Sequence, residues 1–180
     1  MRIQLIIVGL LATTSCSTKT DQRSPESNSR FNILYKKNAL CNFSSSIKKD
    51  SFKIIVVGES FAKGDFGFQI KNDSGRLLFN ETYPSISLLG YDFIKTDSTD
   101  TTDYMIRRIE GFFDQYHFIK PAISPDDKFN AKYSNKDIWN EIKSDKRAIG
   151  FRFLVGNRDG HQIVYSKRYG SAVLYFRCCE

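Results

Sequence analysis

Apolar and polar residues alternate, as in β-strands, in a first group of segments. Residues 52–57 form a β-branched run that ends at a glycine. Residues 65–71 place an apolar side chain at every second position, which favours a strand with one buried face. An Asn-Asp-Ser-Gly turn sequence at 72–75 joins this strand to residues 76–81. These segments therefore predict a strand followed by a β-hairpin.

A second group of strand-like segments lies near the C-terminus. The predicted strands are 151–155, 162–165 and 172–177. A second turn sequence, at 157–160, joins the first two of them in the same way as in the first group.

The segment between the two strand groups has helical spacing instead. From residue 102 to 116, apolar side chains recur at intervals of three and four, and the Asp- and Thr-rich segment 97–103 offers N-cap residues. A shorter helix is expected at 136–143, where Ser134 and Asp137 have the spacing of a capping box. The order strands, helix, helix, strands favours an α+β domain with an antiparallel β-sheet and both helices packed on one face.

The N-terminal residues predict an export signal and not a part of the fold. Arg2 is followed by about ten mostly apolar residues at 3–12 and by three small residues at 13–15, the three-part plan of a secretory signal peptide. The apolar run is shorter than the ~18 residues of a transmembrane helix. Residues 1–15 are therefore expected to be a signal peptide.

The sequence Thr13-Thr14-Ser15-Cys16 resembles a bacterial lipobox, in the looser form familiar from Bacteroidetes-like bacteria. Thr13 stands where the usual pattern prefers Leu. The resemblance implies cleavage before Cys16, a diacylglycerol on its thiol, and anchorage to the bilayer of the cell envelope. The outer membrane is the expected site, with the domain facing the periplasm or the cell surface. The alternative is an ordinary cleaved signal that leaves Cys16 a plain thiol.

The residues after Cys16 predict a tether and one domain. Residues 17–30 contain no large apolar side chain, so they cannot bury enough surface to offset the entropy lost on ordering. We expect 16–30 to be the lipidated cysteine with a flexible tether, and 31–180 to be a single domain.

Three further cysteines, Cys41, Cys178 and Cys179, suggest a disulfide, because an exported protein meets an oxidising compartment. Neighbouring residues on a strand point to opposite faces, so Cys41 is expected to pair with either Cys178 or Cys179 but not with both. The alternative is that all three are small buried apolar residues. No Cys-x-x-Cys motif occurs, and His117 and His161 are isolated, so no metal site is predicted.

The formal net charge of +7 does not by itself indicate a polyanion partner. The cations occur as scattered pairs between acidic residues, without the run of five to eight that marks a nucleic-acid site. We expect a solvated basic surface and no nucleic-acid partner.

No catalytic constellation is visible along the chain. His117 and His161 have no nucleophile or carboxylate beside them, Asp126-Asp127 is expected to be a solvated loop pair, and no glycine motif predicts a cofactor. The aromatic stretch 112–118 is interpreted as core, with a ligand groove as the alternative.

The leading hypothesis is a non-catalytic envelope protein or inhibitor that binds another envelope or secreted protein through its surface. A second hypothesis is a hydrolase of cell-wall or surface glycans, with Glu59, Asp65 or Glu81 converging in a cleft. A third is a carrier of a small apolar ligand, which needs a pocket above about 300 Å³.

Overall fold

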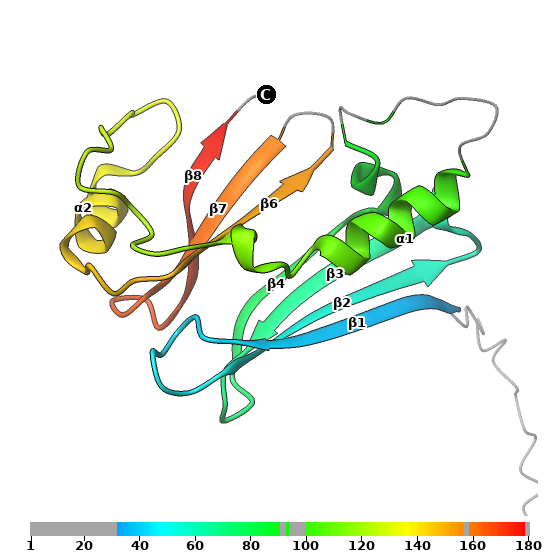
Figure 1. Ribbon diagram of the computed structural model, residues 1–180, viewed down its shortest axis with the longest axis horizontal. Helices are drawn as coiled ribbons and strands as arrows, with labels where there is room; N and C mark the ends of the chain where they lie inside the picture. The colour runs from blue at the N-terminus through cyan, green and yellow to red at the C-terminus, as the bar shows by residue number, and fades with distance from the viewer. Residues whose placement is uncertain (1–31, 91–92, 94–99, 157–158, 179–180) are drawn as a thin grey trace, which may run out of the picture. The chain divides into compact units, whose positions relative to one another are not determined.

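Two antiparallel sheets of four strands each, together with two α-helices, make up most of the fold (Figure 1). The computed structural model describes residues 32–90, 93, 100–156 and 159–178. The first sheet has the order β1-β2-β3-β4 and the second the order β5-β6-β7-β8. The bounds are β1 (Ile33–Cys41), β2 (Asp50–Gly58), β3 (Gly64–Lys71), β4 (Leu77–Pro84), β5 (Phe118–Ile119), β6 (Gly150–Val155), β7 (Asp159–Ser166), β8 (Ser171–Cys178), α1 (Thr101–Gly111) and α2 (Lys136–Ser144). The predicted mixed α+β class is confirmed.

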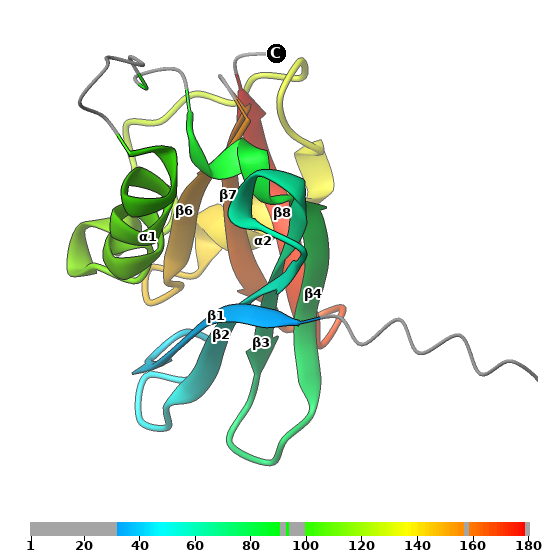
Figure 2. The ribbon, with the colours of Figure 1, turned by 90° about the vertical axis from the view of Figure 1, so that its right-hand side faces the viewer.

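The expectation of one continuous sheet is wrong, because each strand group pairs only within itself. Alternation shows which face of a strand is apolar but not which strand lies beside it. The two sheets approach each other at β4 and β8 and turn their apolar faces toward a shared interior (Figure 2).

Phe68 of β3 lies at the centre of this interior and is fully buried, with 0% of its surface exposed. Its ring centroid is 5.5 Å from that of Phe151 and 5.3 Å from that of Phe153, both on β6. It also lies 5.4 Å from the ring of Phe112, just after α1. Edge-to-face and tilted ring contacts at these distances join both sheets and the helix region into one cluster.

Strand β7 is buried on both sides, so a further layer covers the second sheet. Ile163 belongs to the cluster between the sheets, whereas its neighbour Val164 packs with Trp139 and Ile142 of α2. Met105 of α1 packs in the cluster between the sheets instead. The helices therefore do not share one face, which corrects that part of the prediction. Both clusters lie within the compact unit formed by residues 31–180.

Strand β1 was not predicted, because its sequence ILYKKNALC lacks alternation. It is an edge strand held by backbone pairing with β2, and its Ile33 side chain is 64% exposed. Tyr35 and Lys37 each contact Glu110, which fastens β1 to the end of α1.

The helix boundaries differ from the predicted ones at two places. Helix α1 begins after Asp100, whose carboxylate accepts hydrogen bonds from two backbone N–H groups, but it ends at Gly111 and not at Tyr116. Helix α2 begins after Asn135, whose side chain takes the capping role predicted for Ser134. The Ser134 hydroxyl donates to the Tyr175 carbonyl instead, so tertiary packing decides between two local caps.

The predicted bridge from Cys41 is not formed: Cys41 is a free, half-buried cysteine in the described part of the chain. It ends β1, the edge strand separated by two strands from β4, which is the strand that contacts β8. Three interstrand spacings amount to about 14 Å, and a disulfide spans a Cα separation of roughly 4.4–6.8 Å. Cys179 lies outside the described residues.

We predict that Phe68→Ala lowers the free energy of unfolding by about 3–5 kcal/mol, because it removes a ring that touches both sheets and leaves a cavity. Denaturant unfolding followed by circular dichroism measures this change. Ile33→Ala, at an exposed position, is the control and should change the stability by less than about 0.5 kcal/mol. Equal losses in the two variants would contradict the central role of Phe68.

Candidate functional site

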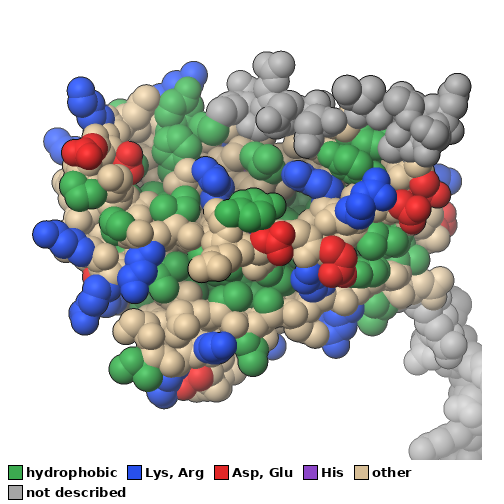
Figure 3. Space-filling view, in the orientation of Figure 1, with side chains coloured by type: hydrophobic (Ala, Val, Ile, Leu, Met, Phe, Trp, Pro, Cys, Tyr) green, Lys and Arg blue, Asp and Glu red, His purple; other side chains and the backbone are tan. Residues whose placement is uncertain are grey.

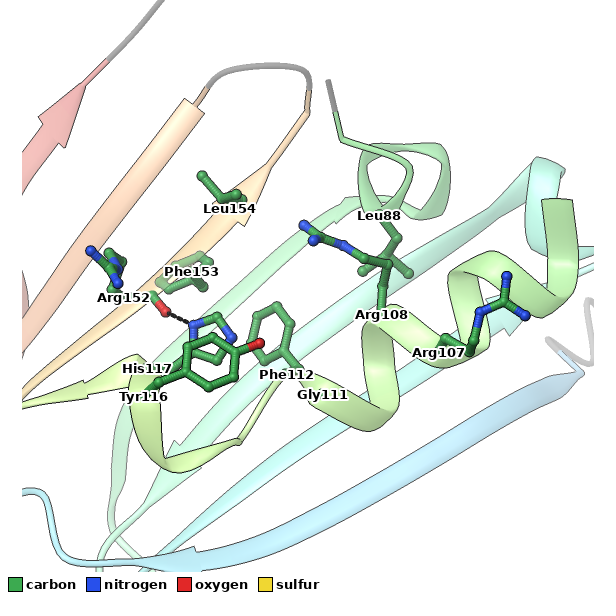
Figure 4. Close-up of a pocket in the computed structure, with 10 residues that line it drawn as sticks. All are labelled: Leu88, Arg107, Arg108, Gly111, Phe112, Tyr116, His117, Arg152, Phe153 and Leu154. Atoms are coloured by element: carbon green, nitrogen blue, oxygen red, sulfur yellow. Dashed lines mark hydrogen bonds between the residues drawn. The ribbon is translucent and has the colours of Figure 1, made fainter. Parts of the chain in front are cut away.

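A pocket of about 410 Å³ lies between the end of α1 and strand β6 (Figure 4). Its deepest residues, Leu88, Phe112 and Phe153, are buried apolar side chains. The remaining lining is mainly cationic and aromatic, and the ten lining residues are Leu88, Arg107, Arg108, Gly111, Phe112, Tyr116, His117, Arg152, Phe153 and Leu154.

The early end of α1 shapes this pocket. The Phe112 N–H donates to the Ile109 carbonyl and the Asp114 N–H donates to the Gly111 carbonyl, so the chain tightens and turns after Gly111. Phe112 and Phe113 then both enter the core, and a short 3-10 helix, Gln115–His117, leads to β5. This turn places Tyr116 and His117 opposite the arginines of α1 (Figure 4).

His117 is held in one orientation. Its Nδ1 atom lies 2.7 Å from the Arg152 carbonyl oxygen, and since a carbonyl only accepts, Nδ1 carries the proton. The neutral ring therefore keeps Nε2 as its acceptor. Burial lowers the pKa of His117, and the charges of Arg152 and Arg108 lower it further, against the opposing effects of this hydrogen bond and of Asp114.

Three guanidinium groups line the pocket without a carboxylate partner. Among the described residues, no Asp or Glu lies within ion-pair distance of Arg107, Arg108 or Arg152. Figure 4 shows the Arg108 side chain extended toward β6 and the Arg107 guanidinium at the right of the pocket. Arg152 and Phe153 are consecutive on β6, so the Arg152 side chain points to the opposite face of the strand from Phe153 and Arg152 borders the pocket at its edge. Arg107 also lies 5.9 Å from the ring of Tyr104. An apolar floor below uncompensated arginines can bind an anionic group through charge-assisted hydrogen bonds.

The pocket lining contains no Ser, Thr, Cys, Asp or Glu, so the lining groups that could act as a nucleophile are the Tyr116 hydroxyl and the His117 imidazole. Of the lining groups, the imidazole of His117 is the one suited to exchanging a proton near neutral pH.

His161 lies in a second polar cluster at the junction of the two sheets. Its Nε2 atom is 3.0 Å from Asp159 Oδ1, and Asp159 also accepts two hydrogen bonds from Arg177. Burial opposes ionisation of Asp159, but the bonds from Arg177 and His161 lower its pKa. Burial raises the pKa of neighbouring Tyr83, so its hydroxyl stays protonated. The bidentate Arg177 contact pairs the carboxylate, and we assign this cluster a structural role.

The acids considered for glycan hydrolysis do not come together. Asp65 and Phe68 are three residues apart on β3 and therefore point to opposite faces, while Glu81 is the register partner of Phe68. Glu59 follows the end of β2 and is exposed. None of these acids lines the pocket between α1 and β6.

The remaining candidate residues have local roles or lie outside the described ranges. Asp127 accepts a hydrogen bond from the Ser124 N–H, and its neighbour Asp126 is exposed. In the described part of the chain, no group of three or more His, Cys, Asp or Glu side chains could hold a metal ion. Cys16 lies outside the described residues, and Cys178 ends β8.

Sequence patterns alone missed the pocket, because its members come from distant segments. Arg152 is a polar residue in an alternating strand, Arg107 lies on the polar side of α1, and half-buried Arg108 flanks the apolar stripe that contains Met105. One signal was available at the second cluster: Asp159 and His161 are two residues apart, so on a strand they share a face.

Comparisons with protein-family models, curated proteins and solved structures find no match to this chain. In the described ranges, neither helix has the length and hydrophobicity needed to cross a bilayer.

We predict that the protein loses stability as the pH falls below about 6.5, and that His117 contributes to this loss. The folded-state pKa of His117 lies below its unfolded value, so the unfolded chain takes up a proton first and the free energy of unfolding decreases until the folded-state pKa is reached. The measurement is denaturant unfolding between pH 7.5 and pH 5, relative to His117→Gln, which should show a smaller slope. Identical slopes would contradict the burial of a neutral His117.

Proposed function

We propose that this chain is an exported, lipid-anchored envelope protein that binds a partner carrying an anionic group in the pocket between α1 and β6. The observation that carries the proposal is the pair Arg107 and Arg108, which have no carboxylate partner among the described residues and lie beside an apolar floor. Binding without catalysis fits the pocket lining, which contains no Ser, Thr, Cys, Asp or Glu.

The pocket favours a ligand with both a charge and an apolar part. Guanidinium groups bind carboxylates and phosphates through two parallel hydrogen bonds, which fixes the orientation of the ligand. The rings of Phe112 and Phe153 offer contact area to an attached apolar or planar group. A volume of about 410 Å³ suits a small molecule or one residue of a larger partner.

The carrier hypothesis is narrowed by the same observation. An uncharged apolar ligand would displace water from the guanidinium groups without replacing its hydrogen bonds, which opposes binding. The guanidinium groups therefore favour an anionic amphiphile over a neutral one as the ligand.

The export part of the proposal rests on residues 1–16 of the sequence. The Cys16→Ala variant is expected to lose metabolic labelling by fatty acid and to move from the membrane fraction to the soluble fraction of the cell, because acyl chains provide the durable anchor. Cys41→Ala is the matched control, since it removes another thiol, and should remain labelled. A Cys16→Ala protein that is still acylated and membrane-bound would rule out the lipid anchor.

The binding part of the proposal is tested with inorganic phosphate and phenyl phosphate, by isothermal titration calorimetry. We expect phenyl phosphate to bind more tightly, because its ring covers the apolar floor. Arg108→Gln should weaken phenyl phosphate binding about tenfold or more, since one charge-assisted hydrogen bond is lost.

Arg147→Gln is the control for this titration, because it makes the same change at an exposed arginine outside this pocket. Binding should remain unchanged in it. No measurable binding of either phosphate, or an equal loss in both variants, would overturn the assignment of the pocket.

A further inference from the structure

Three loops come together at one end of the two sheets, at the lower end in Figure 1. They are the β1–β2 loop (42–49), the β3–β4 turn (72–76) and the β7–β8 turn (167–170). Lys48 Nζ lies 2.6 Å from Asp73 Oδ2, which joins the first two. Arg76 donates to the Tyr165 hydroxyl beside the third, and a small pocket is shared by residues 43–46 and Lys167.

Each of these loops or its flank presents a large apolar side chain to solvent. Ile47 is 88% exposed, Tyr169 is 54% exposed and Leu77 is 48% exposed. Ile47 and Tyr169 lie in the loops and Leu77 lies at the start of β4, and the Arg168 guanidinium lies 5.7 Å from the centre of the Tyr169 ring.

Hydrogen bonds within the 42–49 loop hold Ile47 in its exposed position. The Ser45 hydroxyl accepts hydrogen bonds from the Ile47 and Lys48 N–H groups, and Asn42 donates to the carbonyls of Ser45 and Lys48. At the base, buried Asp50 accepts from the Ser44 N–H and hydroxyl. A loop fixed in this way holds the apolar tip outward and binds a surface without a large ordering cost.

The same end carries a strong excess of positive charge. Exposed cations surround the tips, and they are Lys48, Lys49, Lys71, Arg76, Lys146, Arg147, Lys167 and Arg168. Asp73 pairs with Lys48 and Asp145 with Lys167. Two further acids lie inside this end: Asp50 accepts from Ser44, and Glu141 accepts from the Ser166 hydroxyl beside the β7–β8 turn. The eight cations therefore outnumber these four acids. In the view of Figure 3 the lower left of the molecule accordingly shows mainly blue side chains.

From these observations we propose that this end, the basic tip surface, docks on a bilayer that contains anionic lipids. Apolar side chains flanked by cations match the interface of such a bilayer, where the former enter the headgroup layer and the latter contact the lipid phosphates. The exposed loop residues Ile47 and Tyr169 can reach a flat surface together, whereas Leu88, Phe112 and Phe153 are enclosed in the pocket between α1 and β6.

The tether permits this orientation. Strand β1 runs from Ile33 to Cys41 at the base of the 42–49 loop, a length of about 30 Å. The ~14 residues between Cys16 and the domain reach at most about 45–50 Å. A lipid at Cys16 and the basic tip surface can therefore contact the same bilayer. The docking itself does not require the ligand pocket or the acyl chain.

The test is co-sedimentation of residues 16–180 carrying Cys16→Ser, which lacks both the acyl chain and the apolar segment 3–12. Vesicles of phosphatidylcholine alone are compared with vesicles that also contain phosphatidylglycerol. We expect binding to the anionic vesicles, weakened by added salt. Lys49→Glu with Arg168→Glu should reduce it about tenfold or more. Ile47→Ser with Tyr169→Ser should reduce it about tenfold.

Lys132→Glu with Lys136→Glu is the matched control. It makes the same charge change near the opposite end of β8, where the Arg177 N–H donates to the Tyr133 carbonyl, and should leave vesicle binding within about twofold. All substituted side chains are exposed, and unchanged circular dichroism and phenyl phosphate binding verify the fold.

The proposal is overturned if anionic vesicles bind no better than phosphatidylcholine, or if the control loses as much binding as the tip variants. It is also overturned if the protein binds neither vesicle type but binds soluble polyglutamate through the same cations. That result would assign the surface to an acidic macromolecule. The Cys16→Ser protein used with the vesicles carries no acyl group. A failure of the Cys16→Ala labelling experiment is therefore distinguishable from a failure of the vesicle experiment.

Discussion

Aromatic packing between the two sheets is the constraint on which the rest of the structure depends. Each sheet of four strands has one apolar face, and Phe68 of β3 meets Phe151 and Phe153 of β6 within it. An apolar face that stays in contact with water contributes no hydrophobic stabilisation, so each sheet depends on the other to cover that face. The second sheet is covered twice, because β7 sends Ile163 to the aromatic side and Val164 to α2.

The ligand pocket follows from that packing. Phe112 and Phe113 are consecutive, and both join the aromatic cluster because α1 stops at Gly111 and the chain turns. The turn carries His117 to the backbone of β6, where the Arg152 carbonyl fixes its tautomer. The turn thereby brings α1, with Arg107 and Arg108, close to β6 at Arg152. Leu88, Phe112 and Phe153 form the apolar floor between them. Each lining residue is of a type common in its helix or strand. The site is distinguished by having arginines and a histidine beside buried apolar side chains.

The sequence predicted local structure well and tertiary relations poorly, for a physical reason. Strands with clear alternation, such as 65–71, and the turn at 72–75 depend on neighbours in the chain, and both are confirmed. Strand β1 depends on pairing with β2, so its own residues carry no comparable signal. The disulfide expected from Cys41 depended on proximity across two sheets, which spacing along the chain does not encode. The pocket was missed for the same reason, because tertiary packing brings Arg108 and Arg152 close together and their spacing along the chain does not show it.

The pocket between α1 and β6 and the basic tip surface present positive charge in two different geometries. In the pocket, arginines stand above buried rings, so a ligand must match both the charge and the shape of a concavity. At the basic tip surface, cations surround separate exposed apolar side chains. Such a surface can contact a flat bilayer and does not select one particular lipid. The two regions are separated along the second sheet, because Arg152 pairs with Gln162 and the β7–β8 turn begins five residues later, about 17 Å away. A domain resting on its tips therefore keeps the pocket clear of the lipid, and its ligand would be met in the aqueous space beside the membrane.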